Sequence, residues 1–257
     1  MIDYHNHILP NIDDGASNFD EALSMIQKSH LEGTSHIIST VHFNHPQMKK
    51  VSKDYNYLCS VAKELEDRAK MIGVPIKITP SAEVYYNDKI LDSINNPLVR
   101  FQDKYILIEL DTQILPIDFS EKIYEIQLAG LKVIIAHPER YRNIQNSMNL
   151  VKRWRDRDIL LQLNAGSILG HYGFKVQKIA MDIIYGGHCD LIGSDAHNFS
   201  TRPFCLKKAY NKIEVLCGKN IVKILKSNAE AIACNKTLNK TPAVSMSYLR
   251  MLKSLVK

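Results

Sequence analysis

Short apolar runs rich in β-branched residues alternate with longer amphipathic stretches along most of the chain. Short runs of this composition are typical of buried strands, whereas apolar residues spaced three and four apart are typical of helices packed on one face. The pattern predicts strands at Ile2–Tyr4, His36–Thr40, Ile76–Thr79, Tyr105–Glu109, Lys132–Ala136, Ile159–Leu163 and Asp190–Gly193. Between the strands it predicts helices at Phe19–Glu32, Lys53–Met71, Phe119–Ala129, Met148–Arg157, Lys175–Tyr185 and Phe204–Leu216.

The first predicted helix has the clearest start and stop signals. Asn18 is a suitable N-cap, Glu21 lies three residues further on as a capping-box partner, and Gly33 follows the last helical residue. Gly73 and Gly130 follow the second and third predicted helices in the same way. These signals favour independent helices that connect successive strands.

A strand followed by a helix, repeated about seven times, predicts an α/β fold, because parallel neighbouring strands need a helical crossover. Seven such repeats fit a distorted, TIM-like, seven-stranded (β/α) barrel better than an open sheet, and an open doubly wound sheet is the alternative. No linker, internal repeat or low-complexity stretch divides the chain. We therefore expect a single domain over residues 1–257, with a C-terminal tail from about residue 236.

Charge and hydropathy narrow the choice of partners. The net charge of +6 suits an anionic substrate, but the basic residues form no stripe with interleaved aromatic residues, so we expect no nucleic-acid partner. No apolar run has the length of a membrane span, and the N-terminus resembles no signal peptide. We expect a cytoplasmic protein without stable membrane insertion. The sequence leaves the oligomeric state open.

The five cysteines are scattered and form no C-x-x-C pair, which is typical of reduced thiols in a reducing compartment. None of them is followed six residues later by arginine, so the chain lacks the phosphate-binding loop of thiol-based tyrosine phosphatases. If this chain cleaves phosphate esters, it does so without a cysteine nucleophile.

Histidines and carboxylates recur at or just beyond the predicted strand ends. Because the C-terminal ends of the strands of a parallel barrel open onto one face, we expect these side chains to converge there. Each signal alone is weak, since an H-x-H pair occurs by chance and a histidine after a strand is often an ordinary core residue. Their common placement favours a metal centre. The candidate ligands are His5, His7, Asp14, His42, Glu83, Glu109, His137, Asp195 and His197. Spacing alone does not choose between Asp13 and Asp14.

The ligand types indicate which metals would bind. Five histidines and four carboxylates without a thiolate suit Mn²⁺, and also Fe or Zn, and exceed what one ion uses, so two or three ions are expected. Three divalent ions would outweigh the four carboxylates by about two positive charges, which matches a phosphate dianion. Arg140 and Arg202 follow His137 and His197 closely and are candidates to grip phosphate oxygens.

At these positions the chain resembles the polymerase and histidinol phosphatase (PHP) family, and within it the bacterial tyrosine phosphatases encoded with capsule and exopolysaccharide synthesis. The segment from His5 to Gly15 matches the H-x-H-I-L-P-x-I-D-D-G opening of that subgroup. His137-Pro138-Glu139-Arg140, Ser194-Asp195-Ala196-His197-Asn198 and Ser227-Asn228-Ala229-Glu230 also fit its pattern. The resemblance extends from Met1 to about Asn235.

The resemblance implies a PHP-type barrel, three manganese-type ions and hydrolysis of phosphotyrosine by metal-activated water. The implied substrate is the tyrosine-rich tail of a cognate bacterial tyrosine kinase that controls polymer export. His5, His7, Glu83 and Asp195 would hold one ion; Glu83, Glu109 and His137 a second; Asp14, His42 and His197 a third. Arg140 and Arg202 would orient the phosphate.

The chain departs from the subgroup around the pocket. It has His42-Phe43 where the subgroup usually has two histidines, Leu110-Asp111 where it has Phe-Pro, and Tyr85 where it has arginine. We expect these changes to affect substrate preference more than the chemistry. The rival hypotheses are a phosphatase of a small monoester such as histidinol phosphate or of nucleic-acid ends, and a catalytically silent module with structural ions. The basic stretch Met246–Lys257 is expected to dock on the barrel or fray.

Overall fold

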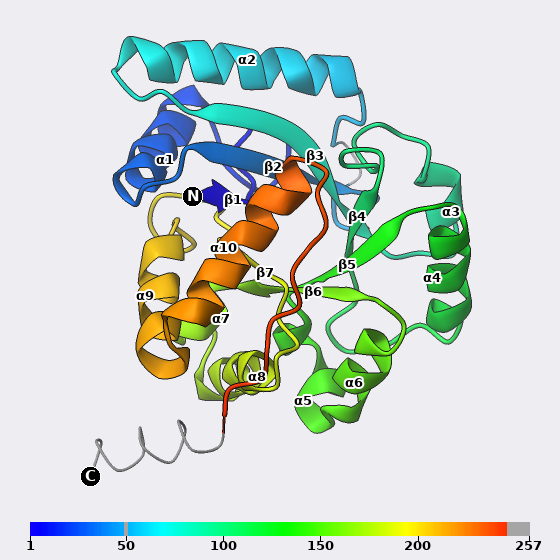
Figure 1. The fold of residues 1–257 in the computed structure, drawn as a ribbon. Coiled ribbons are helices and arrows are strands. Elements are labelled where there is room, and N and C mark those ends of the chain that lie inside the picture. The colour runs from blue at the N-terminus through cyan, green and yellow to red at the C-terminus, as the bar shows by residue number, and fades with distance from the viewer. Residues whose placement is uncertain (49–50, 246–257) are drawn as a thin grey trace.

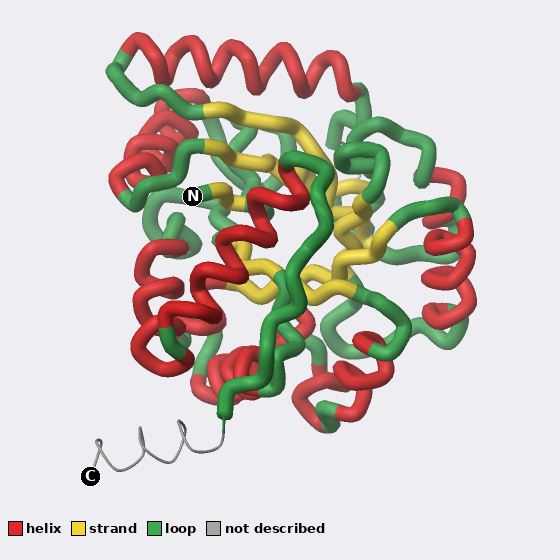
Figure 2. Tube along the Cα trace, in the orientation of Figure 1, coloured by secondary structure: helices red, strands yellow, loops and turns green. Residues whose placement is uncertain are grey.

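Seven strands form one sheet in which each neighbouring pair is parallel and the spatial order follows the chain. Figure 1 labels the strands, and Figure 2 shows them in yellow with the helices in red. The computed structural model describes residues 1–48 and 51–245. The strands are β1 (Ile2–Asp3), β2 (His36–Phe43), β3 (Lys77–Tyr85), β4 (Tyr105–Glu109), β5 (Lys132–Ala136), β6 (Leu160–Asn164) and β7 (Leu191–Gly193).

Helices follow the strands and surround the sheet (Figure 1). Those the sequence predicted are α1 (Phe19–Leu31), α2 (Tyr55–Met71), α4 (Phe119–Leu128), α6 (Asn149–Arg155), α8 (Phe174–Tyr185) and α9 (Leu206–Cys217). Those it did not predict are α3 (Ile90–Ser93), η1 (Pro138–Arg140), α5 (Arg142–Asn146), α7 (Ala165–Leu169) and α10 (Lys219–Ala233).

Hydrogen bonds between the ends of the first and last strands bring the two edges of the sheet together. The backbone N–H of His7 donates to the carbonyl of Ala196 at 2.9 Å, and that of Asp195 donates to the carbonyl of His5 at 2.8 Å. The Asp3 carboxylate, at the end of β1, accepts from the N–H of Ser194 at 3.0 Å. The sheet is therefore a nearly closed barrel, which confirms the predicted seven-stranded α/β barrel.

The barrel has an inner and an outer apolar core. The inner cluster includes Tyr4, Ile38, Leu107 and Leu191, whose side chains fill the space between the strands. Ala229 and Ile232 of α10 belong to the same cluster, and Figure 1 shows this helix running across the strands. Helix α10 therefore closes the end of the barrel at which the strands begin, and leaves the end at which they finish for polar residues.

Strands β2 and β3 extend further than the sequence predicted, because they pair with each other from His36 and Lys77 to Phe43 and Val84. The predicted ends at Thr40 and Thr79 were wrong, so His42 and Glu83 lie within strands rather than after them. Pro80 interrupts the pattern but sits where β3 pairs only with β2, since pairing with β4 begins at Glu83. A strand with one open edge tolerates proline.

The predicted cap of α1 is present. The Asn18 side chain accepts from the N–H of Glu21 at 2.9 Å, and Gly33 has a φ of 92°, which suits a residue that ends a helix. The Glu21 carboxylate binds the N–H and hydroxyl of Ser17 rather than the backbone of Asn18. The start of the helix is thus fixed by both side chains.

The chain returns along the barrel after α10. Asn228 holds this segment through hydrogen bonds with Asn239 at 2.8 and 3.0 Å, and the N–H of Val244 donates to the carbonyl of Tyr185. The predicted tail Met246–Lys257 lies outside the described residues. Within residues 1–48 and 51–245, no helix combines the length and the apolar composition that a membrane crossing needs.

Candidate metal centre

The nine predicted ligands lie together at the end of the barrel where the strands finish, each within about 4 Å of at least one other. They come from six strand ends and from the loop after β1. Among the described residues, three groups of ligand atoms are close enough to hold an ion: His7, Asp14, His42 and His197; His5, His7 and Glu83; and His42, Glu83 and Glu109.

Glu83 is the centre of the arrangement. Its Oε2 lies 3.3 Å from Nε2 of His5 and 3.4 Å from Nε2 of His7. Oε2 is also 3.4 Å from Nδ1 of His42, and Oε1 is 2.9 Å from Nε2 of His137. One buried carboxylate therefore contacts four imidazoles, a position from which it can bridge two cations.

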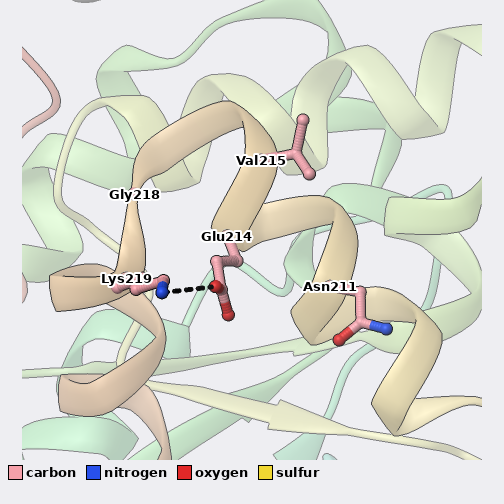
Figure 3. Close-up of a pocket in the computed structure, with 5 residues that line it drawn as sticks. All are labelled: Asn211, Glu214, Val215, Gly218 and Lys219. Carbon is pink, nitrogen blue, oxygen red and sulfur yellow. Dashed lines mark ion pairs between the residues drawn. The ribbon is translucent and has the colours of Figure 1, made fainter.

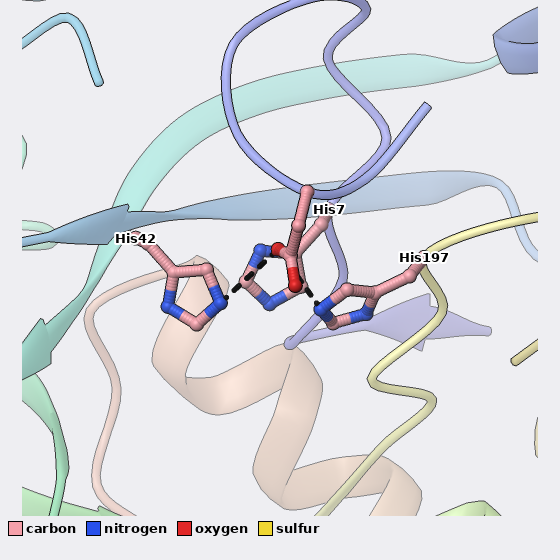
Figure 4. Close-up of side chains that lie close together, drawn as sticks. His7, His42 and His197 are labelled. Atoms are coloured by element: carbon pink, nitrogen blue, oxygen red, sulfur yellow. Dashed lines mark ion pairs between the residues drawn. The ribbon is translucent and has the colours of Figure 1, made fainter. Parts of the chain in front are cut away.

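Asp14 completes a second group on the open side of the centre. Its Oδ1 lies 3.3 Å from Nε2 of His42 and 3.3 Å from Nε2 of His197, and Figure 4 shows these two rings on either side of His7. The Asp14 side chain is 43% exposed, whereas His42 and His197 are buried. This group is therefore the part of the centre that solvent reaches most easily.

Glu109 forms the third group, on the β4 side. Its Oε1 is 3.5 Å from Nε2 of His137, and its Oε2 is 3.8 Å from Nδ1 of His42. The resemblance implied Glu83, Glu109 and His137 as one ligand set, and the structure adds His42 to that neighbourhood.

The remaining nitrogen of three histidines is held by a neighbouring acceptor. Nδ1 of His5 lies 2.7 Å from Oε1 of Gln162, and Nδ1 of His7 lies 2.9 Å from Oδ2 of Asp13. Nδ1 of His197 lies 3.0 Å from the carbonyl of Asp195. A proton held on Nδ1 leaves Nε2 as an electron-pair donor toward the centre, which is the arrangement that metal-binding histidines require.

These contacts also separate the two neighbouring aspartates. Asp13 holds His7 from behind and accepts from the N–H groups of His42 and Gly15 at 3.0 Å, so its carboxylate is occupied. Asp14 faces His42 and His197. Of the two residues that spacing could not distinguish, Asp14 is the one that lies among the candidate ligands.

Strand β6 supplies no candidate ligand, but it supports two of them. The Gln162 amide reaches His5 with its oxygen and donates to Oδ1 of Asn164 at 3.0 Å, and Asn164 donates to Oδ2 of Asp195 at 2.6 Å. The sequence analysis missed both residues. The sequence did contain a pattern that could have found them. Gln162 and Asn164 alternate with leucines in a buried strand and so share its inner face.

His137 reaches the centre through an unusual backbone conformation. Along β5, Ile134 and Ala136 face the inner cluster, whereas Val133 and Ile135 face the helices. Simple alternation would turn His137 toward the helices as well, but its φ of 33° directs the ring to Glu83. Left-handed backbone at a non-glycine residue costs on the order of 1–3 kcal/mol and is typical of functional sites.

The donor atoms fit cations. Several buried nitrogen and oxygen atoms that face the centre have no hydrogen-bond partner: Nε2 of His5, His7 and His197, Nδ1 of His42 and Oε2 of Glu109. Burial and the adjacent Glu83 carboxylate raise the pKa of Glu109 well above its usual range. Burial would also raise the pKa of Glu83, but His5 and His137 hold it well below that range. Shared cations would relieve the repulsion between these two carboxylates.

Both candidate phosphate-binding arginines flank the centre. A terminal nitrogen of Arg202 lies 2.8 Å from Oδ2 of Asp195, and one of Arg140 lies 3.4 Å from the same oxygen. Nε of Arg202 is buried and has no hydrogen-bond partner. The Arg140 guanidinium lies 5.1 Å from the ring centre of Tyr172. Asp195 therefore aligns the two guanidinium groups while their other N–H groups stay available to an anion.

Of the residues that depart from the subgroup's pattern, only Tyr85 and Asp111 lie at the mouth of the site, the opening of the metal centre to solvent. Phe43 and Leu110 are buried in the outer core. Tyr85 and Asp111 instead approach each other beside the centre, with the tyrosine hydroxyl 3.4 Å from Oδ2 of Asp111. His45 is also close, with Nε2 3.9 Å from Oε2 of Glu109.

A separate surface hollow lies at the turn from α9 to α10 (Figure 3). Its lining consists of Asn211, Glu214, Val215, Gly218 and Lys219. None of these is a candidate ligand or candidate phosphate-binding residue, so this hollow offers no comparable chemistry.

Comparison with known proteins agrees with the geometry. Residues 1–233 match the family model described as capsular polysaccharide synthesis, CpsB/CapC. The chain is 28% identical over 242 residues to CapC of Staphylococcus aureus, covering 93% of this chain and 94% of CapC. It is 30% identical over 244 residues to the tyrosine-protein phosphatase YwqE of Bacillus subtilis, covering 94% of this chain and 95% of YwqE.

A solved structure supports the same relation. A crystal structure from a study of YwqE from Bacillus subtilis and CpsB from Streptococcus pneumoniae, described as metal-dependent tyrosine phosphatases, superposes with a TM-score of 0.88. The sequence identity is 28%, and the match covers 95% of this chain and 99% of the other.

Proposed function

The chain belongs to the CpsB/CapC family of capsular polysaccharide synthesis, and from this premise we propose that it removes phosphate from tyrosines in the tail of a cognate bacterial tyrosine kinase. It is a metal-dependent tyrosine-protein phosphatase. The proposal goes further in naming the kinase tail as the substrate, control of capsular or exopolysaccharide export as the role, and the cytoplasm as the location.

The observation that carries the proposal is the sharing of ligands around Glu83. Three groups of histidines and carboxylates overlap at His7, His42 and Glu83, and two arginines adjoin them through Asp195. With divalent cations bound, such an arrangement would concentrate positive charge where a phosphate dianion binds, and it contains no cysteine. It is suited to phosphate ester hydrolysis without a covalent thiol intermediate.

We assign one ion to His5, His7, Glu83 and Asp195, a second to Glu83, Glu109 and His137, and a third to Asp14, His42 and His197. Mn²⁺ is the proposed native metal, because imidazole and carboxylate ligands suit it, as they also suit Fe and Zn. When bound, such ions supply Lewis acidity and lower the pKa of a coordinated water.

The protein's own residues bind and orient the ester. Arg140 and Arg202 would donate hydrogen bonds to the non-bridging phosphate oxygens, while Asp195 fixes the positions of the two guanidinium groups relative to each other. The tyrosine leaves as a phenolate with a pKa of about 10, so it needs little help from a general acid. This is consistent with the proposed role of Arg140 and Arg202, which bind the phosphate and do not protonate the leaving oxygen.

A phosphatase assay on the purified full chain tests the proposal. We expect turnover of phosphotyrosine peptides that EDTA abolishes and Mn²⁺ restores, with metal content measured on the same sample. Histidinol phosphate, assayed in parallel, should be a much poorer substrate. Chelator-resistant turnover, or a preference for histidinol phosphate, would contradict the proposal.

The variant His137→Ala addresses the rival of a silent module with structural ions. We expect it to lose bound metal and activity while its circular dichroism stays unchanged, because the buried ring contacts Glu83 in the polar centre and belongs to neither apolar core. Loss of the folded state together with the metal would favour a structural role.

A further inference from the structure

Tyr85 occupies the outermost position on the inner face of β3. Residues two apart on a strand share a face, so Tyr85 lies on the same side as Glu83, about 7 Å nearer the mouth. Its partner across the sheet is Glu109, the last residue of β4. The side chain of Tyr85 therefore forms part of the rim directly above the metal centre.

Two contacts fix the Tyr85 ring in this position. The ring of His45 meets it edge-on, with the ring centres 4.9 Å apart and an interplanar angle of 77°. The hydroxyl donates to Oδ2 of Asp111, whose Oδ1 accepts from the N–H groups of Gln113 and Ile114 at 2.7 and 3.0 Å. Since Asp111 is itself anchored, the ring is held in place, and it remains partly exposed.

The other tyrosines near the site have different surroundings. Tyr86 is buried in the outer core, with its hydroxyl 3.0 Å from Asp118 and its ring against Phe119. Tyr172 lies beside Arg140, on the loop after α7, and serves the phosphate side of the mouth. Tyr85 is thus the tyrosine of β3 that faces the space above Glu83.

The two levels at which Glu83 and Tyr85 lie match the positions of the phosphoryl group and the ring in an aryl phosphate. A phosphoryl group bound by Arg140 and Arg202 at the level of Glu83 would direct its ester oxygen toward the mouth. In phosphotyrosine the aromatic ring follows that oxygen immediately and would lie at the level of Tyr85. An alkyl ester such as phosphoserine places only a methylene group there.

We propose that Tyr85 determines specificity by packing against the tyrosyl ring of the substrate, an inference that rests on the proposed function. His45 and Asp111 hold the Tyr85 ring ready for this contact. The gain in binding affinity is selective for aryl esters, because Tyr85 can form an aromatic pair only when the ester carries a ring. Tyr85 takes no part in binding the phosphoryl group.

The test compares two non-hydrolysable inhibitors, benzylphosphonate and methylphosphonate, on the Mn²⁺-loaded full chain, because a methylene group replaces the ester oxygen in the first. For Tyr85→Leu we expect the inhibition constant of benzylphosphonate to rise about three- to tenfold relative to that of methylphosphonate. Tyr85→Phe keeps the ring and its contact with His45 but loses the hydrogen bond to Asp111, so it should retain most of the wild-type ratio. Tyr124→Leu, at an exposed position on α4, is the matched control and should also retain it.

Substrate kinetics provide the second readout. Because the leaving group is identical for wild type and variant, a change in the ratio of kcat/KM for phosphotyrosine and phosphoserine peptides isolates the ring contact. We expect Tyr85→Leu to lower this ratio while metal content stays constant. Should that variant fail to fold, Tyr85→Gln gives the same comparison at this partly exposed site.

The outcomes separate the two proposals. A wild-type protein that is inactive on phosphotyrosine when loaded with metal would refute the proposed function. An active wild type whose Tyr85→Leu variant keeps both ratios unchanged, or loses aryl and alkyl ligands equally, would overturn only the inference about Tyr85.

Discussion

At the scale of single residues, the site depends on side chains outside the candidate ligand set. Gln162 and Asp13 hold His5 and His7 from behind, and Asn164 holds Asp195. Such contacts fix the tautomer and direction of each ligand, so the position of the ligand atoms depends on them. Gln162 and Asn164 are neutral residues in an apolar strand, which a search for histidine and carboxylate pairs overlooks.

We predict that Gln162→Leu weakens metal binding about 10- to 100-fold, because Nδ1 of His5 loses its partner while the volume of the side chain is nearly kept. Titration of the metal-free protein with Mn²⁺, followed by calorimetry, measures the effect. Gln113→Ala, on the exposed loop after β4, should bind as the wild type does. Equal affinities for Gln162→Leu and wild type would show that Gln162 does not orient the ligand.

At the scale of elements, periodicity located the strands and their connecting helices well, but not where β2 and β3 end. Their extension depends on pairing with each other, which covers the polar segment from Ser39 to Thr40 and tolerates Pro80. Helix α10 was missed because a single residue, Gly218, separates it from α9. Its apolar positions Ile221, Leu225 and Ile232 have helical spacing, yet their burial becomes clear only against the barrel.

Helix α10 yields the prediction at this scale. Ile232→Ala should lower the free energy of unfolding by about 2–5 kcal/mol, because the side chain fills the closed end of the barrel and its loss leaves a cavity. Urea denaturation measures this change. The exposed Lys223→Ala on the same helix should change stability by less than about 0.5 kcal/mol. A similar small effect for Ile232→Ala would mean that α10 does not seal the core.

At the scale of the whole molecule, closure of the barrel creates the centre. The candidate ligands come from positions 5 to 197 of the chain, and the hydrogen bonds between the ends of β1 and β7 bring His7 and Asp195 together. The single-domain organisation stays a prediction. Since seven strands contribute to one sheet and six of their ends supply ligands, folding and metal binding should be coupled.

We predict that saturating Mn²⁺ raises the unfolding temperature of the EDTA-treated protein. One ion at 100 times its dissociation constant adds about 2.7 kcal/mol, which corresponds to roughly 5–10 °C for a chain of this size. Differential scanning calorimetry measures the shift. Asp14→Ala should reduce it only in part, because Asp14 belongs to one of the three ligand groups. An unfolding temperature that is insensitive to metal would count against cations in this centre.

The sequence alone determined the alternation of strands and helices, and with it a parallel sheet. It favoured a barrel over an open sheet, and it indicated the end at which histidines and carboxylates gather. These features follow from local periodicity and from the chemistry of residue types, both of which can be read directly from the sequence. The tertiary structure alone decided that Asp14 rather than Asp13 faces the centre, that His137 turns inward, and that Gln162 and Asn164 support the ligands. Those outcomes depend on backbone angles and on contacts across the barrel between residues far apart in sequence, which local periodicity does not specify.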